Sequence, residues 1–128
     1  MKLINYLIIQ IIPFLPKVFV RLVASPYIAG ITDDEMLVNV QKLNNKGYDV
    51  AIDILGEHVK TEKEATEITE RYANLYDRIA SQGLDANLSI KLSHIGQDLG
   101  YELVRKNLMI LVNAAKKHNN FFLNNFFF

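Results

Sequence analysis

Four side chains that carry or bind charge lie at the ends of two short, partly apolar stretches of the chain. Asp53 and Glu57 follow the first stretch, and Lys91 and Ser93 end the second. Carboxylates suit proton transfer and ion pairing, and an ammonium group suits the binding of an anion. Over residues 86–93 apolar and polar residues alternate, which indicates a strand with one apolar face. If the polar face meets water, Lys91 serves solubility; if it meets a cavity, Lys91 is a fixed positive charge for an anionic ligand.

Capping residues and apolar spacing indicate three helices. Thr32 with Glu35, and Thr61 with Glu64, have the form of capping boxes, in which the threonine and the glutamate satisfy backbone N–H groups of the first turn. Apolar residues recur at helical spacing after each box, and a glycine follows each run. A third apolar run has the same spacing without a box. We therefore expect helices over about 33–45, 62–82 and 101–117.

Two strands are expected between these helices, near 49–55 and 87–92. The order helix–strand–helix–strand–helix favours right-handed βαβ units and a parallel sheet. Parallel strands covered on both faces are apolar on both faces, but these stretches are apolar on one face only. That pattern suits a barrel strand, whose outer face packs on helices and whose inner face lines a pocket. We predict an α/β fold, the N-terminal portion of a (β/α)8 TIM-type barrel, truncated because a whole barrel needs about 250 residues and the chain has 128.

Composition narrows the possible functions. Fourteen basic and fourteen acidic residues give a formal net charge of zero, so no overall field attracts nucleic acid. The absence of cysteine excludes disulfides, thiolate metal sites and cysteine nucleophiles. The three histidines are not spaced as metal ligands, so we expect no metal site and interpret each as a loop or helix-end residue: His58, His94 and His118. No glycine-rich phosphate loop or Ser–His–Asp set is present.

Both ends of the chain differ from its middle. Residues 1–26 form an apolar stretch interrupted by two prolines, which we interpret as a hydrophobic docking helix before the domain; a membrane-surface helix or a signal peptide is the alternative. Residues 27–118 hold the first βα units. Residues 119–128 contain almost only Asn and Phe where a third strand is due. A short aromatic strand or a disordered tail would explain them, but we favour a shifted reading frame that has replaced the true third strand.

Three runs, in order along the chain, resemble the proline dehydrogenase family. Tyr27-Ile-Ala-Gly30 resembles the Tyr-Val-Ala-Gly that begins the family's barrel. Asp53-Ile-Leu-Gly-Glu57 resembles the Asp-Leu-Leu-Gly-Glu of its first strand, and Asn87-Leu-Ser-Ile-Lys-Leu92 the Asn-Ile-Ser-Val-Lys-Leu of its second. The resemblance covers about residues 15–120. It implies a distorted (β/α)8 barrel that binds FAD and oxidises L-proline to 1-pyrroline-5-carboxylate, with electrons passing to a membrane quinone.

The resemblance also implies roles for particular residues. Lys91 is expected to point into the barrel and pair with the proline carboxylate, with Asn87 and Ser89 lining the pocket more deeply. Glu57 is expected to act as an active-site gate by pairing with an arginine late in the barrel. For Asp53 a structural hydrogen bond to a neighbouring strand is expected rather than catalysis. No residue is assigned to catalysis or to cofactor binding, and the implied location is cytoplasmic, with possible peripheral contact at the inner membrane.

The chain departs from the family at its third strand. Where the family has a run of the type Arg-Ile-Asp-Met-Glu, this chain ends in FFLNNFFF, which contains no acid. We therefore expect a truncated, inactive piece of an FAD-dependent oxidoreductase of proline catabolism, which does not hold FAD by itself. The alternatives are a small self-sufficient α/β binding module and a membrane-surface module, both without catalysis.

Overall fold

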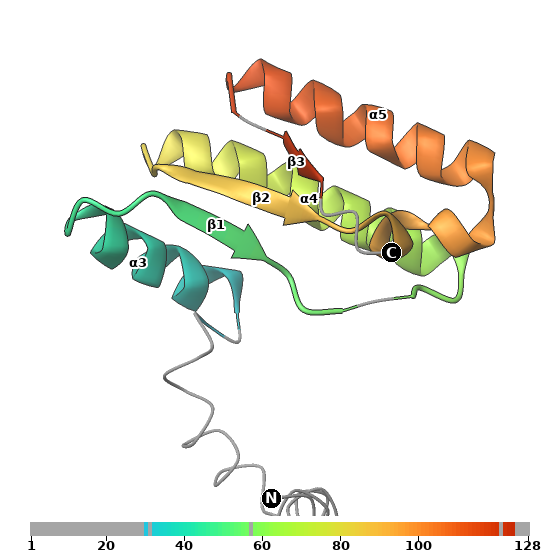
Figure 1. The fold of residues 1–128 in the computed structure, drawn as a ribbon, viewed down its shortest axis with the longest axis horizontal. Helices are drawn as coiled ribbons and strands as arrows, with labels where there is room; N and C mark the ends of the chain where they lie inside the picture. The colour runs from blue at the N-terminus through green and yellow to red at the C-terminus, as the bar shows by residue number, and fades with distance from the viewer. Residues whose placement is uncertain (1–29, 31, 57, 121, 125–128) are drawn as a thin grey trace, which may run out of the picture. The chain divides into compact units, whose positions relative to one another are not determined.

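The computed structural model describes residues 30, 32–56, 58–120 and 122–124 (Figure 1). The chain divides into two compact units, residues 1–39 and 40–128, with the boundary inside the first described helix. The segment 1–26, expected to form an apolar docking helix, lies outside the described residues. The helices and strands that the structure describes lie between Asp33 and Asn124.

The three expected helices are confirmed. They are α3 (Asp33–Asn44), α4 (Glu62–Ser81) and α5 (Tyr101–Lys117). The capping residues act as expected, since the Oγ1 atoms of Thr32 and Thr61 each accept a backbone N–H from the residue three positions on, at 3.2 Å. In the second box the Glu64 carboxylate accepts the N–H of Lys60 (2.7 Å), one residue before the Thr61 cap, whereas in a standard capping box it accepts the N–H of the cap residue itself. This cap fixes the point at which the chain turns from the first strand into α4.

The strands are parallel, as predicted. β1 (Val50–Asp53) pairs with β2 (Ala86–Ile90), and β2 pairs with β3 (Phe122–Asn124), giving the order β1-β2-β3. β2 ends two residues earlier than expected, and two short 3-10 helices follow it: η3 (Leu92–Ile95), which includes the residue expected to end the strand, and η4 (Gln97–Leu99). β3 lies inside the stretch 119–128, so a short strand forms there; a replaced reading frame stays a prediction about its origin.

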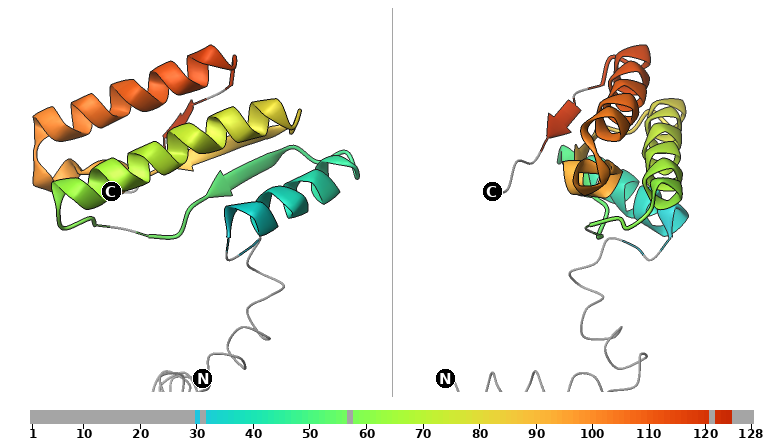
Figure 2. Two further views of the ribbon diagram at one scale, coloured as in Figure 1. Left: turned by 180° about the vertical axis from the view of Figure 1, so that it is seen from behind. Right: turned by 90° about the vertical axis from the view of Figure 1, so that its right-hand side faces the viewer.

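The core lies between the sheet and two helices. α4 and α5 lie side by side on one face of the sheet (Figures 1 and 2). The apolar residues of the two longer strands face them, and burial of this surface is the main driving force for folding. The fully or almost fully buried side chains that form the core include Ile52, Leu88 and Ile90 of the sheet and Tyr72, Leu75, Tyr76, Ile79 and Leu111 of the helices.

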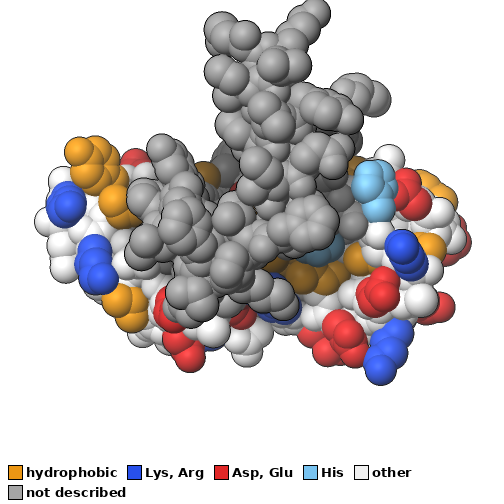
Figure 3. Space-filling model, turned by 90° about the horizontal axis from the view of Figure 1, so that it is seen from below, with side chains coloured by type: hydrophobic (Ala, Val, Ile, Leu, Met, Phe, Trp, Pro, Cys, Tyr) orange, Lys and Arg blue, Asp and Glu red, His pale blue; other side chains and the backbone are white. Residues whose placement is uncertain are grey.

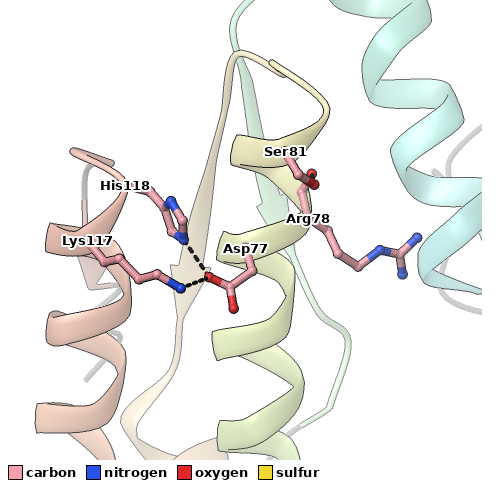
Figure 4. A network of polar contacts seen from close by, with 5 residues as sticks. All are labelled: Asp77, Arg78, Ser81, Lys117 and His118. Atoms are coloured by element: carbon pink, nitrogen blue, oxygen red, sulfur yellow. Dashed lines mark hydrogen bonds and ion pairs between the residues drawn. The ribbon is translucent and has the colours of Figure 1, made fainter.

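At the amino ends of the strands, hydrogen bonds tie α4 to α5. Asp77 of α4 accepts hydrogen bonds at one oxygen, Oδ1, from Lys117 Nζ (2.8 Å) and His118 Nε2 (2.5 Å) at the end of α5 (Figure 4). These bonds hold the pKa of Asp77 below its usual value, with the Lys117 bond the largest cause. These hydrogen bonds join α4 to α5 near the amino ends of β1 and β2, away from the carboxyl ends of the two strands.

The surface shows charges of both signs. On the described part of the face in Figure 3, acidic and basic side chains are interspersed rather than separated. This agrees with the formal net charge of zero. Among the residues that the structure describes, no helix is long and apolar enough to span a membrane.

Candidate functional site

The sheet has a polar face, formed by the residues that alternate with the core. The register places Ala51 opposite Asn87 and Asp53 opposite Ser89, so these side chains share the face that α4 and α5 do not cover. Asp53 is exposed, Asn87 is half-buried and Ser89 is only 5% exposed. The alternation of apolar and polar residues in the sequence therefore corresponds to two faces of the sheet: an apolar face that packs on α4 and α5, and a polar face that these helices do not cover.

Lys91 lies at the carboxyl end of this polar face. It follows β2 directly and precedes η3, where its carbonyl accepts the backbone N–H of His94 (3.0 Å). Its side chain is 19% exposed, and its Nζ lies 3.6 Å from Oδ2 of Asp53. The structure thus brings together two of the residues singled out in the sequence, an ammonium group and a carboxylate from adjacent strands. A partly enclosed ammonium at this place suits the binding of a carboxylate.

The other predicted site residues are divided between described and undescribed positions. Ser93 lies in η3 and is half-buried. Glu57, the expected gate, lies outside the described residues, and its role stays a prediction. Its two neighbours have backbone conformations that L-residues rarely adopt, with φ of +148° at Gly56 and +53° at His58. Strained backbone of this kind concentrates at functional sites.

His94 has a role that the sequence did not reveal. Its ring is buried, at 7% exposure, and its Nδ1 lies 3.4 Å from the Tyr72 hydroxyl, with the two rings edge to face. A Cβ added at Gly56 would lie 2.7 Å from His94 Nε2, so the loop after β1 rests directly on this imidazole. The sequence predicted a loop or helix-end residue, and His94 lies near the end of the short helix η3. Its burial had no signal in the local sequence because it depends on a contact 38 positions away.

Electrostatic effects reach from the polar face into the core. Burial raises the pKa of the Tyr72 hydroxyl on α4, and the negative charge of Asp53 is the second cause. Tyr72 therefore stays neutral over the physiological range, as a hydrogen-bonding group packed against His94. A second tie between the loops joins His58 Nδ1 to Asp98 Oδ2 at 2.6 Å. Two contacts, one buried and one exposed, thus hold the loop after β1 against the segment after β2.

An open cleft of about 550 Å³ lies beside the loop after β1 and the first turns of α4. Its lining carries charges of both signs, with Lys60 and Arg71 set against Glu64 and Glu67. Part of this charge is already used, because the Glu64 carboxylate caps the helix and Glu67 lies 3.7 Å from Lys63. Within the described ranges, no three His, Cys, Asp or Glu side chains gather as a metal site would require.

Comparison with known proteins shows that this chain is similar in sequence to one protein family. The family model described as proline dehydrogenase matches residues 36–125. Proline dehydrogenase 1 of Bacillus subtilis subsp. natto is 37% identical over 99 residues, 77% of this chain and 33% of that protein. Proline dehydrogenase 2 of Bacillus subtilis (strain 168) is 32% identical over 98 residues, and the proline dehydrogenase of Deinococcus radiodurans 28% over 101, again 77% of this chain and about a third of each relative. The chain spans about a third of the length of the curated relatives it matches.

Proposed function

Because this chain belongs to the proline dehydrogenase family, we propose that its polar sheet face forms part of the site where L-proline is oxidised to 1-pyrroline-5-carboxylate. In this proposal the sheet is the first part of a (β/α)8 barrel, and the polar face is the inner face of the barrel. The observation that carries the proposal is the place of Lys91, which lies at the carboxyl end of β2, where barrels of this kind hold their active sites.

The part assigned to this chain is binding and orientation. The Lys91 ammonium pairs with the proline carboxylate and so fixes the ring relative to the barrel axis. At 19% exposure the ammonium is partly shielded from water, which strengthens a charge-assisted hydrogen bond. Ser89, buried on the same face, lines the pocket below the ligand. Glu57 as a gate belongs to the same proposal.

The proposal includes FAD as the cofactor, which would accept the hydride taken from proline. A flavin dinucleotide carries a pyrophosphate, which needs several converging N–H donors or cations. The N-terminus of α4 is capped by its own Thr61 and carries Glu62 and Glu64 in its first turn, and α5 has Glu102 in its first turn. Neither of these helix N-termini offers such a set of donors, and we assign no described residue to the dinucleotide. A membrane quinone as electron acceptor and a cytoplasmic location with peripheral membrane contact complete the proposal.

A chimera tests this function. Residues 27–118 of this chain replace their counterpart in proline dehydrogenase 1 of Bacillus subtilis (strain 168), which is 36% identical over 99 residues, so that the acid-free stretch 119–128 is left out. We expect the chimera to bind flavin and to reduce a dye in the presence of proline. A chimera that folds and holds flavin but leaves proline unoxidised would show that this chain does not form that part of the site.

The 128-residue chain alone provides the complementary measurement. We expect it neither to hold FAD nor to oxidise proline, because residues 119–128 carry no acid where the family has one and the chain spans about a third of the length of its relatives. A purified chain with a flavin spectrum and proline-dependent dye reduction would contradict this expectation. It would also show that fewer elements suffice than the length of the relatives suggests.

A further inference from the structure

We infer that Asp53 is the positioning residue of Lys91, with its carboxylate holding the lysine ammonium in place over the polar face of the sheet. The inference deepens the proposed function and rests on it for the ligand, since that function assigns the ammonium a substrate carboxylate to bind. The pairing itself stands on the geometry of β1 and β2.

The backbone fixes both partners. Asp53 ends β1 and lies opposite Ser89 in the parallel register, and Lys91 is two residues beyond Ser89 on the same face of the sheet. Lys91 is held in turn by the 3.0 Å hydrogen bond from His94 N–H to its carbonyl. Two adjacent strands therefore bring a carboxylate and an ammonium to one place, where Nζ and Oδ2 lie 3.6 Å apart.

The chemistry of lysine makes a positioning partner useful here. A lysine ammonium is a point charge on a flexible four-carbon stem, so its location depends on what it pairs with. The Lys91 side chain is 19% exposed and that of Asp53 41%, so the ammonium is the more enclosed partner and the carboxylate the more open one. Ion pairs this exposed contribute little to folding stability, and the main consequence of the pair is the orientation of the ammonium.

The negative charge of Asp53 also acts on a group in the core. That charge contributes to the raised pKa of the Tyr72 hydroxyl, which lies in the core beneath the sheet. The Asp53 carboxylate thus acts electrostatically both on Tyr72 in the core and on the Lys91 ammonium.

The test measures how fast each lysine of the 128-residue chain reacts with a brief pulse of acetic anhydride, read by peptide mass spectrometry. In Asp53→Asn the ammonium loses the carboxylate 3.6 Å away, and we expect Lys91 to be acetylated roughly two- to fivefold faster. The other lysines serve as internal references and should not change. Asp53→Glu, which keeps the carboxylate, should restore most of the protection.

Asp98→Asn is the matched control, because Asp98 carries the same charge near the same end of the sheet but pairs with His58. It should leave the Lys91 rate unchanged. An unchanged Lys91 rate in Asp53→Asn overturns the inference, and so does a general rise at all lysines, which would show a loosened fold instead. Circular dichroism of each variant identifies that second case.

Adding L-proline separates the inference from the proposed function. Protection of Lys91 by proline supports the binding role, whereas unchanged labelling at saturating proline counts against that role for this chain. Either result leaves the comparison of Asp53→Asn with wild type intact, because that comparison contains no ligand. The positioning role and the substrate therefore succeed or fail in different arms of the experiment.

Discussion

The two ends of the β1–β2 sheet are built differently. At the amino end, polar groups bond closely to one another: Asp77 accepts from Lys117 and His118, and the Asn44 side chain bonds the backbone N–H and C=O of Asp85 at 2.9 Å. At the carboxyl end, Lys91 and Asp53 face each other at 3.6 Å on the polar face, beside a loop with positive φ at Gly56 and His58. Hydrogen bonds hold the amino end together, and the carboxyl end presents partly exposed charged groups.

This difference suggests that the amino and carboxyl ends of the sheet serve different purposes. In barrels of parallel strands the amino end serves stability and the carboxyl end carries the chemistry. The hydrogen bonds at the amino end resist separation of α4 from α5, while the partly exposed charges at the carboxyl end are the groups to which the proposed function assigns ligand binding. Substitutions at the two ends should therefore have different consequences for stability and for binding.

The largest effect on stability is expected for Gly56→Ala at the carboxyl end. The new Cβ would lie 2.7 Å from His94 Nε2, at a φ of +148° that alanine rarely adopts. Backbone strain and overpacking together should cost about 2–4 kcal/mol. Urea unfolding of the 128-residue chain, followed by circular dichroism, measures this loss.

Gly83→Ala is the matched control nearer the amino end. Gly83 also has a positive φ, +62°, but a Cβ there would meet nothing within 4 Å. Its cost should be limited to the left-handed backbone, about 1–2 kcal/mol. Equal losses for the two alanines would show that His94 does not support the loop after β1.

Tyrosine hydroxyls on α4 give a smaller effect of opposite sign. Tyr76 is fully buried and its hydroxyl has no hydrogen-bond partner among the described residues, while burial raises its pKa to about 12. Tyr76→Phe removes an unsatisfied polar group and should stabilise the chain by about 1 kcal/mol. Tyr72→Phe, one turn closer to the carboxyl end, loses the contact with His94 and should not stabilise it. The Tm of both variants, measured by thermal unfolding, tests this expectation. A higher Tm in both variants would mean that the Tyr72–His94 contact does not contribute to stability.

The smallest effect, and the one with a clear pH dependence, is expected for Asp77→Asn. The folded-state pKa of Asp77 is lowered, so its stabilising contribution is present above the unfolded value of about 3.9 and is lost as the pH falls through the folded pKa. The variant should have a slightly lower Tm than wild type at pH 7 and the same Tm at about pH 2. A difference in Tm that persists unchanged at pH 2 would rule out the charged tie as its source.

Much of this fold is readable from local patterns. The two threonine caps predict where α3 and α4 begin, and the alternation over 86–93 predicts the polar face of β2. These features depend on neighbours a few residues apart. The parallel pairing follows from the order of the elements. The partner of Lys91 was less accessible: the sequence indicated a structural contact of Asp53 with a neighbouring strand, and the structure pairs Asp53 with Lys91, which directly follows β2.

Features that depend on distant contacts were not predicted. The burial of His94 requires Gly56 and Tyr72 to meet it in space, and neither is near it in sequence. The gate role proposed for Glu57 requires an arginine from elsewhere in the proposed barrel, so no local pattern determines it. For residues 119–128 a short aromatic strand was one of the alternatives, and a short strand at Phe122–Asn124 pairs in parallel with β2, a partner more than 30 positions away in the sequence.

The most direct measurement of the central claim compares two lysines in the chimera, one at each end of the sheet. Lys91→Met removes the proposed partner of the proline carboxylate, and Lys116→Met removes an exposed lysine near the end of α5. Loss of one charge-assisted hydrogen bond costs about 1.5–3 kcal/mol, so Lys91→Met should lower kcat/KM for proline roughly ten- to hundredfold with flavin content unchanged. Lys116→Met should stay within about twofold of the parent chimera. Equal kcat/KM in both variants would contradict the claim that the carboxyl end of this sheet binds the substrate.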